Sequence, residues 1–148
     1  MPEITLPDGA VLTVEPGSTV ADVAARIGPR LAAAAVGAYL TTAANGKGEV
    51  VEMSHPITEN CRMRILTPTV EDRESLDLLR HSCAHVMAQA IVELWPEAKL
   101  VYGPPVEDGF YYDIDLDRPI TPEDFPAIEQ RMESIIKADL PFRRYELP

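Results

Sequence analysis

The chain has 148 residues, of which 46% are hydrophobic and 25% are charged, and its formal net charge at pH 7 is −11. These values exclude a disordered or fibrous chain and leave room for one ordinary domain or two small ones. No stretch reaches the roughly 18 apolar residues of a membrane span, and the acidic balance argues against general affinity for nucleic acid.

Residues 1–66 have the pattern of a small β-rich domain. Strands at 3–6 and 10–14 flank an Asp8-Gly9 pair, which favours a tight turn between antiparallel strands. After a helix, three more strands are predicted at 35–40, 49–52 and 61–66. This order predicts a ubiquitin-like β-grasp. Because the segment has no nucleophile, metal cluster or phosphate loop, we interpret it as a docking module, with an inert structural cap as the alternative.

The helix of this first segment has clear signals at both ends. Ser18 or Thr19 can cap its start, and Asp22 is placed to reach back to the cap. Gly28-Pro29 is expected to end it. A polar, proline-containing stretch at 67–74 is expected to be the linker to the next segment.

The second segment, 75–148, opens with a long helix, predicted from Ser75 as N-cap to Trp95 because Pro96 enforces its end. At about 100° per residue, one broad apolar stripe contains Leu76, Leu79, Cys83, Val86, Met87, Ala90, Ile91 and Leu94. His81 and His85 lie on roughly the opposite side, among other apolar residues. A helix that is apolar on two sides is buried on two sides, so the histidines are expected to face protein or a crevice.

Paired strands are predicted next, at 99–102 and 109–115. A second amphipathic helix follows, which can start at either Thr121 or Asp124. Its predicted core stripe consists of Phe125, Ile128, Met132, Ile135 and Ile136. A final strand is expected at 142–147.

The two histidines are one helical turn apart, so their side chains project from one face. Three interpretations remain open from the residues alone. His81 and His85 could be two ligands of a metal that needs further ligands from elsewhere. They could be a catalytic imidazole and its orienting neighbour, or ordinary hydrogen-bonded residues of the interior. The Glu that zinc peptidases carry next to the first His is absent, which argues against peptidase chemistry.

Cys61 and Cys83 have no metal-ligand spacing, so we expect two buried free thiols in a reducing compartment. The N-terminal sequence lacks the basic start and apolar core of a signal peptide, and we therefore expect a cytoplasmic protein. Acidic charge concentrates in residues 67–148, which carry net −9 against −2 for residues 1–66. Local RNA contact remains open at arginines that could equally be solvated charges: Arg62, Arg64, Arg73, Arg80, Arg143 and Arg144.

Four motifs follow one another in the second segment: Arg-His-Ser-Cys-Ala-His at 80–85, Leu-Trp-Pro at 94–96, Gly-Phe-Tyr-Tyr-Asp at 109–113 and Asp-Leu-Asp at 115–117. In this order and spacing they resemble the start of the editing domain of the threonyl-tRNA synthetase family. Residues 1–66 resemble the TGS domain that precedes it in bacterial members. The resemblance covers essentially the whole chain.

The resemblance implies an editing half-site that hydrolyses serine wrongly attached to threonine tRNA. Serine lacks only a methyl group of threonine, which provides about 1–3 kcal/mol of discrimination, so a second hydrolytic site is needed. On this chain, His81 is implied to position or deprotonate the attacking water, His85 to be its partner, and Tyr112 to line the pocket.

In that family a later Cys-x-x-x-His element completes the site, and the 148 residues do not contain it. ATP and zinc bind in an aminoacylation domain that is also absent here, so no cofactor and no metal ligand are expected in this chain. The implied partner is the acceptor arm of threonine tRNA, and the implied homodimer forms through the missing domains. We therefore expect an N-terminal piece of a synthetase that neither charges tRNA nor edits alone.

The expected fold is α+β: a TGS β-grasp at 1–66, then the incomplete first part of an editing domain at 75–148. The incomplete part should leave unpaired strand edges and uncovered apolar surface. Two other functions are weighed against this one. One is a standalone TGS-type module that binds RNA or protein without catalysis. The other is a trans-editing protein of the alanyl-tRNA type, against which the missing Cys-x-x-x-His counts.

Overall fold

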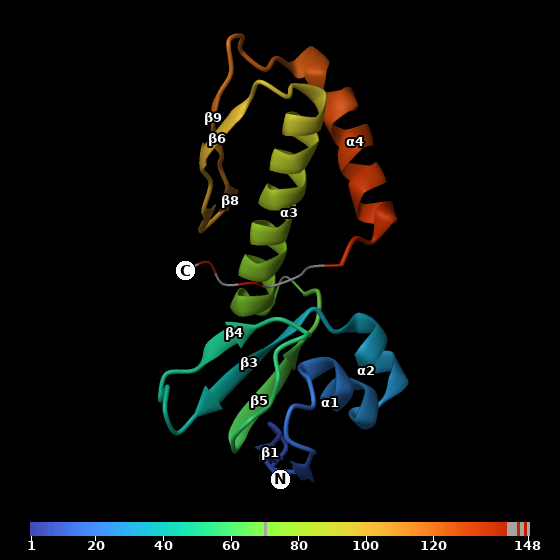
Figure 1. Cartoon of the computed structure of the whole chain (residues 1–148), viewed down its shortest axis with the longest axis vertical. Helices are drawn as coiled ribbons and strands as arrows, with labels where there is room; N and C mark the ends of the chain where they lie inside the picture. The colour runs from blue at the N-terminus through green and yellow to red at the C-terminus, as the bar shows by residue number, and fades with distance from the viewer. Residues whose placement is uncertain (70, 142–144, 146, 148) are drawn as a thin grey trace. The chain divides into compact units, whose positions relative to one another are not determined.

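The computed structural model describes residues 1–69, 71–141, 145 and 147. It divides into two compact units, Met1–Leu76 and Asp77–Pro148 (Figure 1). The strand predicted at 142–147 and the pair Arg143-Arg144 fall on residues outside the described set, apart from Tyr145 and Leu147. No helix of the described residues is long and apolar enough to cross a membrane.

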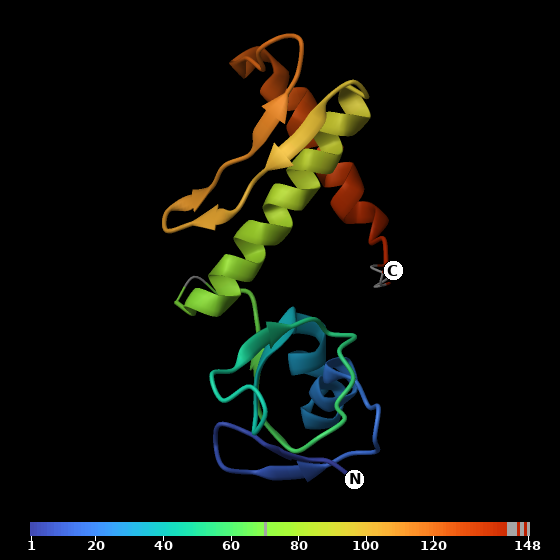
Figure 2. The same ribbon diagram turned by 60° about the vertical axis from the view of Figure 1, so that its left-hand side comes forward.

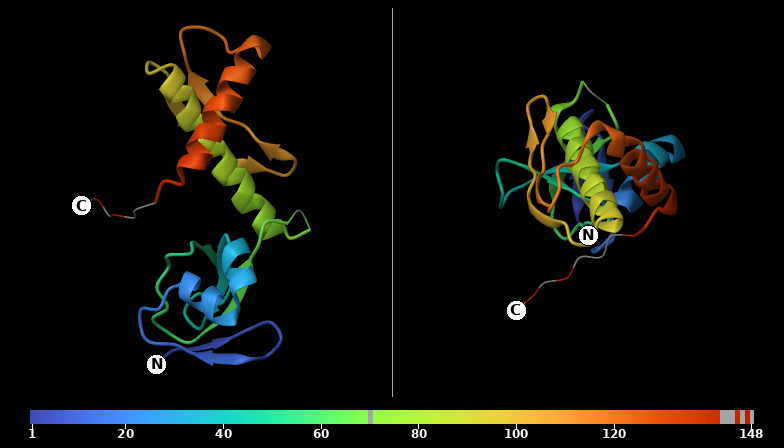
Figure 3. Two further views of the ribbon diagram at one scale, coloured as in Figure 1. Left: turned by 90° about the vertical axis from the view of Figure 1, so that its right-hand side faces the viewer. Right: turned by 90° about the horizontal axis from the view of Figure 1, so that it is seen from above.

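The first unit contains a five-stranded mixed sheet in the order β2-β1-β5-β3-β4. Its strands are β1 (Glu3–Thr5), β2 (Val11–Thr13), β3 (Gly37–Thr42), β4 (Glu49–Val51) and β5 (Cys61–Leu66). β1 pairs parallel with β5, and the other pairs are antiparallel. Helices α1 (Val20–Ile27) and α2 (Pro29–Ala34) lie together on one side of this sheet (Figures 1 and 3). The predicted β-grasp is confirmed.

Local signals account for the first turn and the first helix. Gly9 has φ +85°, a conformation that glycine adopts without steric cost, and Asp8 accepts a hydrogen bond from the Ala10 amide at 3.0 Å. Thr19 caps α1: its hydroxyl accepts from the Asp22 amide, and the Asp22 carboxylate accepts from the Thr19 amide at 2.8 Å. The choice between Ser18 and Thr19 is thereby settled for Thr19.

The helix α2 was not expected from the sequence. Gly28 ends α1, as predicted, but the Pro29 that follows starts α2 instead of a loop. Proline is well suited to the first position of a helix, because its missing N–H would have no intrahelical partner there. β3 also begins two residues later than predicted, at Gly37.

The second unit is built around α3 (Arg73–Leu94), whose first residues belong to the first unit. Within the second unit, α3 has strands on one side and α4 on the other (Figures 1 and 2). These elements are β6 (Lys99–Tyr102), β7 (Pro105–Val106), β8 (Gly109–Phe110), β9 (Asp113–Asp115), the 3-10 turn η1 (Pro122–Asp124) and α4 (Phe125–Ala138). β6 pairs with β9 and β7 with β8, all antiparallel. The α+β prediction is confirmed.

Three boundaries differ from the sequence prediction. The predicted strand 109–115 is divided into β8 and β9, which pair with different partners. The long helix begins at Arg73, so Ser75 lies inside its first turn and is not the N-cap. Both candidate starts of the last helix are used, because Thr121 caps η1 and α4 then begins after Asp124.

The core of the second unit lies where α3 meets α4. Its buried residues are Ala90, Ile91, Ala98 and Ile128, surrounded by partly buried Met87, Leu94, Trp95, Ile114, Leu116, Ile120, Met132 and Ile135. Each predicted apolar stripe contains exposed residues. On α3, Cys83 is exposed. On α4, Phe125 and Ile136 are exposed, because this helix packs mainly through Ile128 and its neighbours.

Apolar side chains remain uncovered in the second unit, as the sequence predicts. On β6, Val101 is 68% exposed and Tyr102 60% exposed. Beyond the end of α4, Leu140 is 59% exposed.

Candidate functional site

The two histidines form a stacked pair on α3. The Nε2 atoms of His81 and His85 lie 2.8 Å apart, their ring centroids are 4.8 Å apart, and the ring planes differ by 13°. Two bare ring nitrogens cannot approach this closely, so one Nε2 carries the hydrogen and the other accepts it. The helical spacing of four residues produces this contact directly. The pair is therefore one hydrogen-bonded unit.

Both rings are exposed to solvent within their unit, so the expectation of a buried or crevice-facing pair is wrong. The reason lies in how α3 packs. Within the second unit, the buried positions of the helix are Ala84, Ala88, Ala90 and Ile91, and the histidines lie outside that strip. An exposed pair is accessible to water and to a substrate.

An apolar groove of about 600 Å³ begins beside this pair. Its walls come from α3, from Leu100 on β6 and from the C-terminal end of α4, and His85 is one of its lining residues. Ile135, Ile136 and Leu140 form much of the wall opposite α3. The groove places an imidazole at the edge of an apolar surface, an arrangement common to small-molecule sites.

Tyr112, the predicted pocket residue, lies elsewhere in the unit. It is half-buried between β8 and β9, and its ring lies against the backbone of Gly103. It is not among the described residues that line the groove. The structure therefore brings His81 and His85 together, but of the three predicted site residues His85 alone is found among the described residues that line the groove.

Arg80 is one of the arginines at which the sequence leaves local RNA contact open. In the structure its guanidinium donates to the backbone carbonyls of Val106 and Glu107, at 3.2 and 2.7 Å. These bonds connect α3 to the turn between β7 and β8, next to the first histidine in sequence. No local signal in the sequence indicates such a partner, which is 26 residues away.

The two thiols have different environments. Cys61 is buried in the core of the β-grasp, and burial, with Glu59 nearby, raises the pKa of its thiol. Cys83 is exposed on α3, which contradicts the expectation that both thiols are buried. Among the described residues, no three His, Cys, Asp or Glu side chains are grouped so that they could hold a metal ion.

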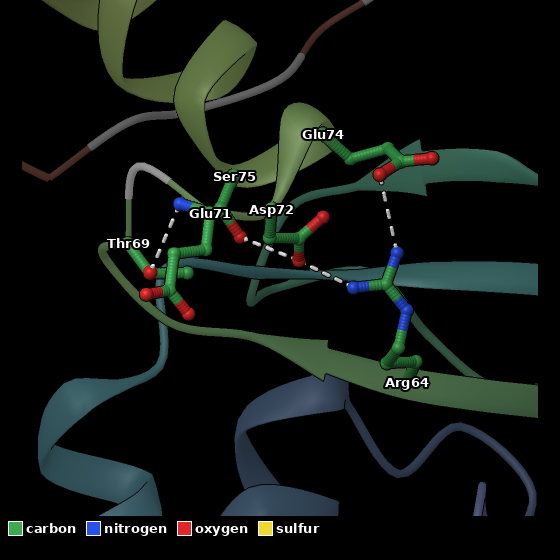
Figure 4. Close-up of polar contacts among 6 residues, drawn as sticks. All are labelled: Arg64, Thr69, Glu71, Asp72, Glu74 and Ser75. Atoms are coloured by element: carbon green, nitrogen blue, oxygen red, sulfur yellow. Dashed lines mark hydrogen bonds and ion pairs between the residues drawn. The ribbon is translucent and has the colours of Figure 1, made fainter.

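A second polar cluster joins β5 to the first turn of α3 in the first unit (Figure 4). The Arg64 guanidinium forms ion pairs with Asp72 and, at 3.3 Å, with Glu74, and the Ser75 hydroxyl donates to Asp72 at 3.0 Å. Burial favours the neutral form of Asp72, but the hydrogen bonds outweigh it and lower the pKa of that carboxyl. Arg64 also lies over the Tyr39 ring, 5.7 Å from its centroid.

Comparison with known proteins finds a matching domain family and a group of curated relatives. The TGS domain family model matches residues 2–67. Curated threonine–tRNA ligases match nearly the whole chain: that of Symbiobacterium thermophilum is 46% identical over 144 residues, and that of Rubrobacter xylanophilus is 47% identical over 147. These alignments cover 97% and 99% of the chain but only 21% and 22% of the relatives. The relative from Novosphingobium aromaticivorans is 48% identical over 143 residues, covering 96% of the chain and 20% of its own length. The chain thus spans about a fifth of the length of the curated relatives that it matches.

Proposed function

We propose that this chain contributes a TGS domain and the first part of an editing domain to a threonine–tRNA ligase. Two observations support the proposal: the TGS family model matches residues 2–67, and nearly the whole chain matches the N-terminal region of such ligases. The complete enzyme attaches threonine to its tRNA with ATP. In this proposal ATP and zinc are bound by the aminoacylation domain, not by these 148 residues, and the enzyme is a cytoplasmic homodimer. The acceptor arm of the tRNA is the partner of this region.

The observation that carries the editing proposal is the contact between the Nε2 atoms of His81 and His85. At 2.8 Å there is no room for a water molecule between the rings. A small rotation of one ring would free the accepting nitrogen, which can then take a proton from water. The hydroxide attacks the ester carbonyl that joins serine to the terminal ribose. The bond between the carbonyl carbon and the ribose oxygen then breaks, the imidazolium returns its proton to that ribose oxygen, and free serine and the tRNA leave.

The additional discrimination against serine that this site must provide is small in free energy but essential for accuracy. One missing methyl group is worth about 1–3 kcal/mol in a binding pocket, so aminoacylation alone lets some serine through. Editing after the transfer removes it. The groove beside His85 provides surface near the reacting group, and further parts of the enzyme complete the pocket.

The test is made in a full-length ligase that contains this region. His81→Ala should slow the hydrolysis of Ser-tRNA by about 10²- to 10⁴-fold, the usual contribution of a general base, and leave the attachment of threonine unchanged. Cys83→Ala is the matched control, because this exposed side chain lies on the same helix between the two histidines. Unchanged hydrolysis of Ser-tRNA by the His81 variant would refute the assignment.

A further inference from the structure

The sheet of the first unit has a second face, opposite α1 and α2 (Figure 3). The strand register places a row of polar residues across three strands on that face. Arg62 on β5 pairs with Thr5 on β1 and with Thr41 on β3. Directly paired residues on neighbouring strands point to the same face of a sheet, so the side chain of Arg62 lies between those of Thr5 and Thr41. Its neighbours along β5, Cys61 and Met63, point to the buried side.

Arg62 differs from Arg64, two residues further along the same strand. The charge of Arg64 is compensated by Asp72 and Glu74. Arg62 is exposed, and its side chain forms no hydrogen bond or ion pair with any of the described residues. β5 thus pairs one arginine with two carboxylates and leaves the guanidinium of Arg62 without an ion pair among the described residues.

Two hollows meet at this arginine. They have volumes of about 280 and 320 Å³, and Thr5, Thr41 and Arg62 line both of them. The first hollow also has Leu6, Pro7 and Tyr39 in its wall, which gives it an apolar and aromatic side. The second also includes Glu3, whose carboxylate disfavours an anion there. An anionic group with an attached ring therefore fits the first hollow.

We propose that this face binds the backbone of single-stranded RNA, with one phosphate held by Arg62 and by the hydroxyls of Thr5 and Thr41. A guanidinium binds phosphate through two parallel hydrogen bonds, and hydroxyl groups supplement it. The sugar or base attached to that phosphate lies in the first hollow, against Pro7 and Tyr39. Because the net charge of −11 disfavours RNA phosphates over the rest of the surface, we expect RNA to bind only at this patch. The proposal rests on the proposed function only in taking RNA as the partner.

The experiment uses the 148-residue chain and a ten-nucleotide oligouridylate. In 50 mM salt, titration with the RNA should shift the backbone amide signals of Thr5, Thr41 and Arg62 and leave those of α4 in place. Arg62→Ala should weaken binding by about tenfold and lower the slope of log affinity against log salt concentration by about one. Arg62→Lys should keep the salt dependence of the parent and part of its affinity. Lysine keeps the positive charge but lacks the planar guanidinium that binds phosphate through two hydrogen bonds.

Two controls make the result specific. Arg30→Ala removes another exposed arginine, on α2 at the helical side of the sheet, and should leave the affinity unchanged. His81→Ala should also bind the oligouridylate normally, so this proposal and the editing proposal can fail separately. Equal affinities and salt slopes for the parent chain and Arg62→Ala would overturn the inference. So would tighter binding of a ten-residue polyglutamate to the same amides, which would indicate a protein partner.

Discussion

A Cβ atom on Gly103 would lie 2.3 Å from the Cδ2 atom of Tyr112, so the tyrosine ring lies directly on the glycine backbone. Gly103 connects β6 to β7, and Tyr112 connects β8 to β9. The contact therefore joins the two connecting segments of the strand layer. Only glycine leaves space for the ring at this distance.

Gly103→Ala should displace the Tyr112 ring and destabilise the second unit by about 1–3 kcal/mol, the usual cost of forcing an extra methyl group into a packed contact. Denaturant unfolding followed by the fluorescence of Trp95, the single tryptophan of the chain, measures this unit. Gly28→Ala is the control, because a Cβ there has nothing within 4 Å. Identical unfolding midpoints for the parent and Gly103→Ala would contradict the packing described.

Asp124 should make the second unit sensitive to acid. The hydrogen bonds from Arg118 and from the Thr121 amide lower the pKa of Asp124 from 3.8 to about 2. Folding therefore favours the ionised carboxylate, and its stabilisation is complete above about pH 4 and is lost as the pH falls towards 2. Asp124→Asn should lower the melting temperature at pH 6, and the difference from the parent should vanish near pH 2.

Trp95 provides the local readout for that experiment, because Arg118 lies over its ring, 4.8 Å from the centroid. Protonation of Asp124 releases Arg118, and the tryptophan emission should change over the same pH range. Asp117→Asn, an exposed carboxylate with no hydrogen bond or ion pair among the described residues, is the control. A difference between the parent and Asp124→Asn that persists at pH 2 would disprove the assignment.

The two cysteines should react at very different rates with a thiol reagent in the native protein. Cys83 is exposed and should react quickly, whereas Cys61 is 7% exposed and its raised pKa leaves less thiolate. Cys83→Ser should therefore remove the fast phase, and Cys61→Ser should leave it unchanged. Two equally fast thiols in the parent would show that the burial of Cys61 is wrong.

Arg64→Ala should loosen the start of α3 without unfolding the β-grasp. It removes the ion pairs to Asp72 and Glu74, and partly exposed pairs of this kind contribute about 1 kcal/mol or less. The amide of Leu76, which donates to the Asp72 carbonyl at 2.9 Å, should exchange its hydrogen faster in the variant. Arg62→Ala on the same strand is the matched control, and equal exchange rates in both variants would contradict the prediction.

The elements that the sequence predicts well are those with local causes. The Asp8-Gly9 turn, the Thr19 cap and the alternation along β5 depend on residues within a few positions of each other. The missed helix α2 has a local cause as well. Gly28 ends α1, and the Pro29 that follows occupies the first position of the next helix. The sequence prediction treated Pro29 only as a helix breaker and therefore missed α2.

Burial on α3 depends on its distant partners, and that is where prediction from the sequence is weakest. The helical stripe that includes Cys83 is continuous, but α4 packs at Ala90 and Ile91 and leaves Cys83 exposed. The spacing of His81 and His85 predicts that they share a face, and they do. It cannot predict their exposure, nor the bonds from Arg80 to a turn that is distant in sequence.

The parallel pairing of β1 with β5 has a consequence for synthesis on the ribosome. β1 ends at Thr5 and β5 begins at Cys61, so the first strand lacks its central neighbour until more than fifty further residues have been made. Local hairpins can form before then, but the sheet closes only when β5 emerges from the exit tunnel. The β-grasp therefore acquires its stability late and in one step, when all 66 of its residues are available.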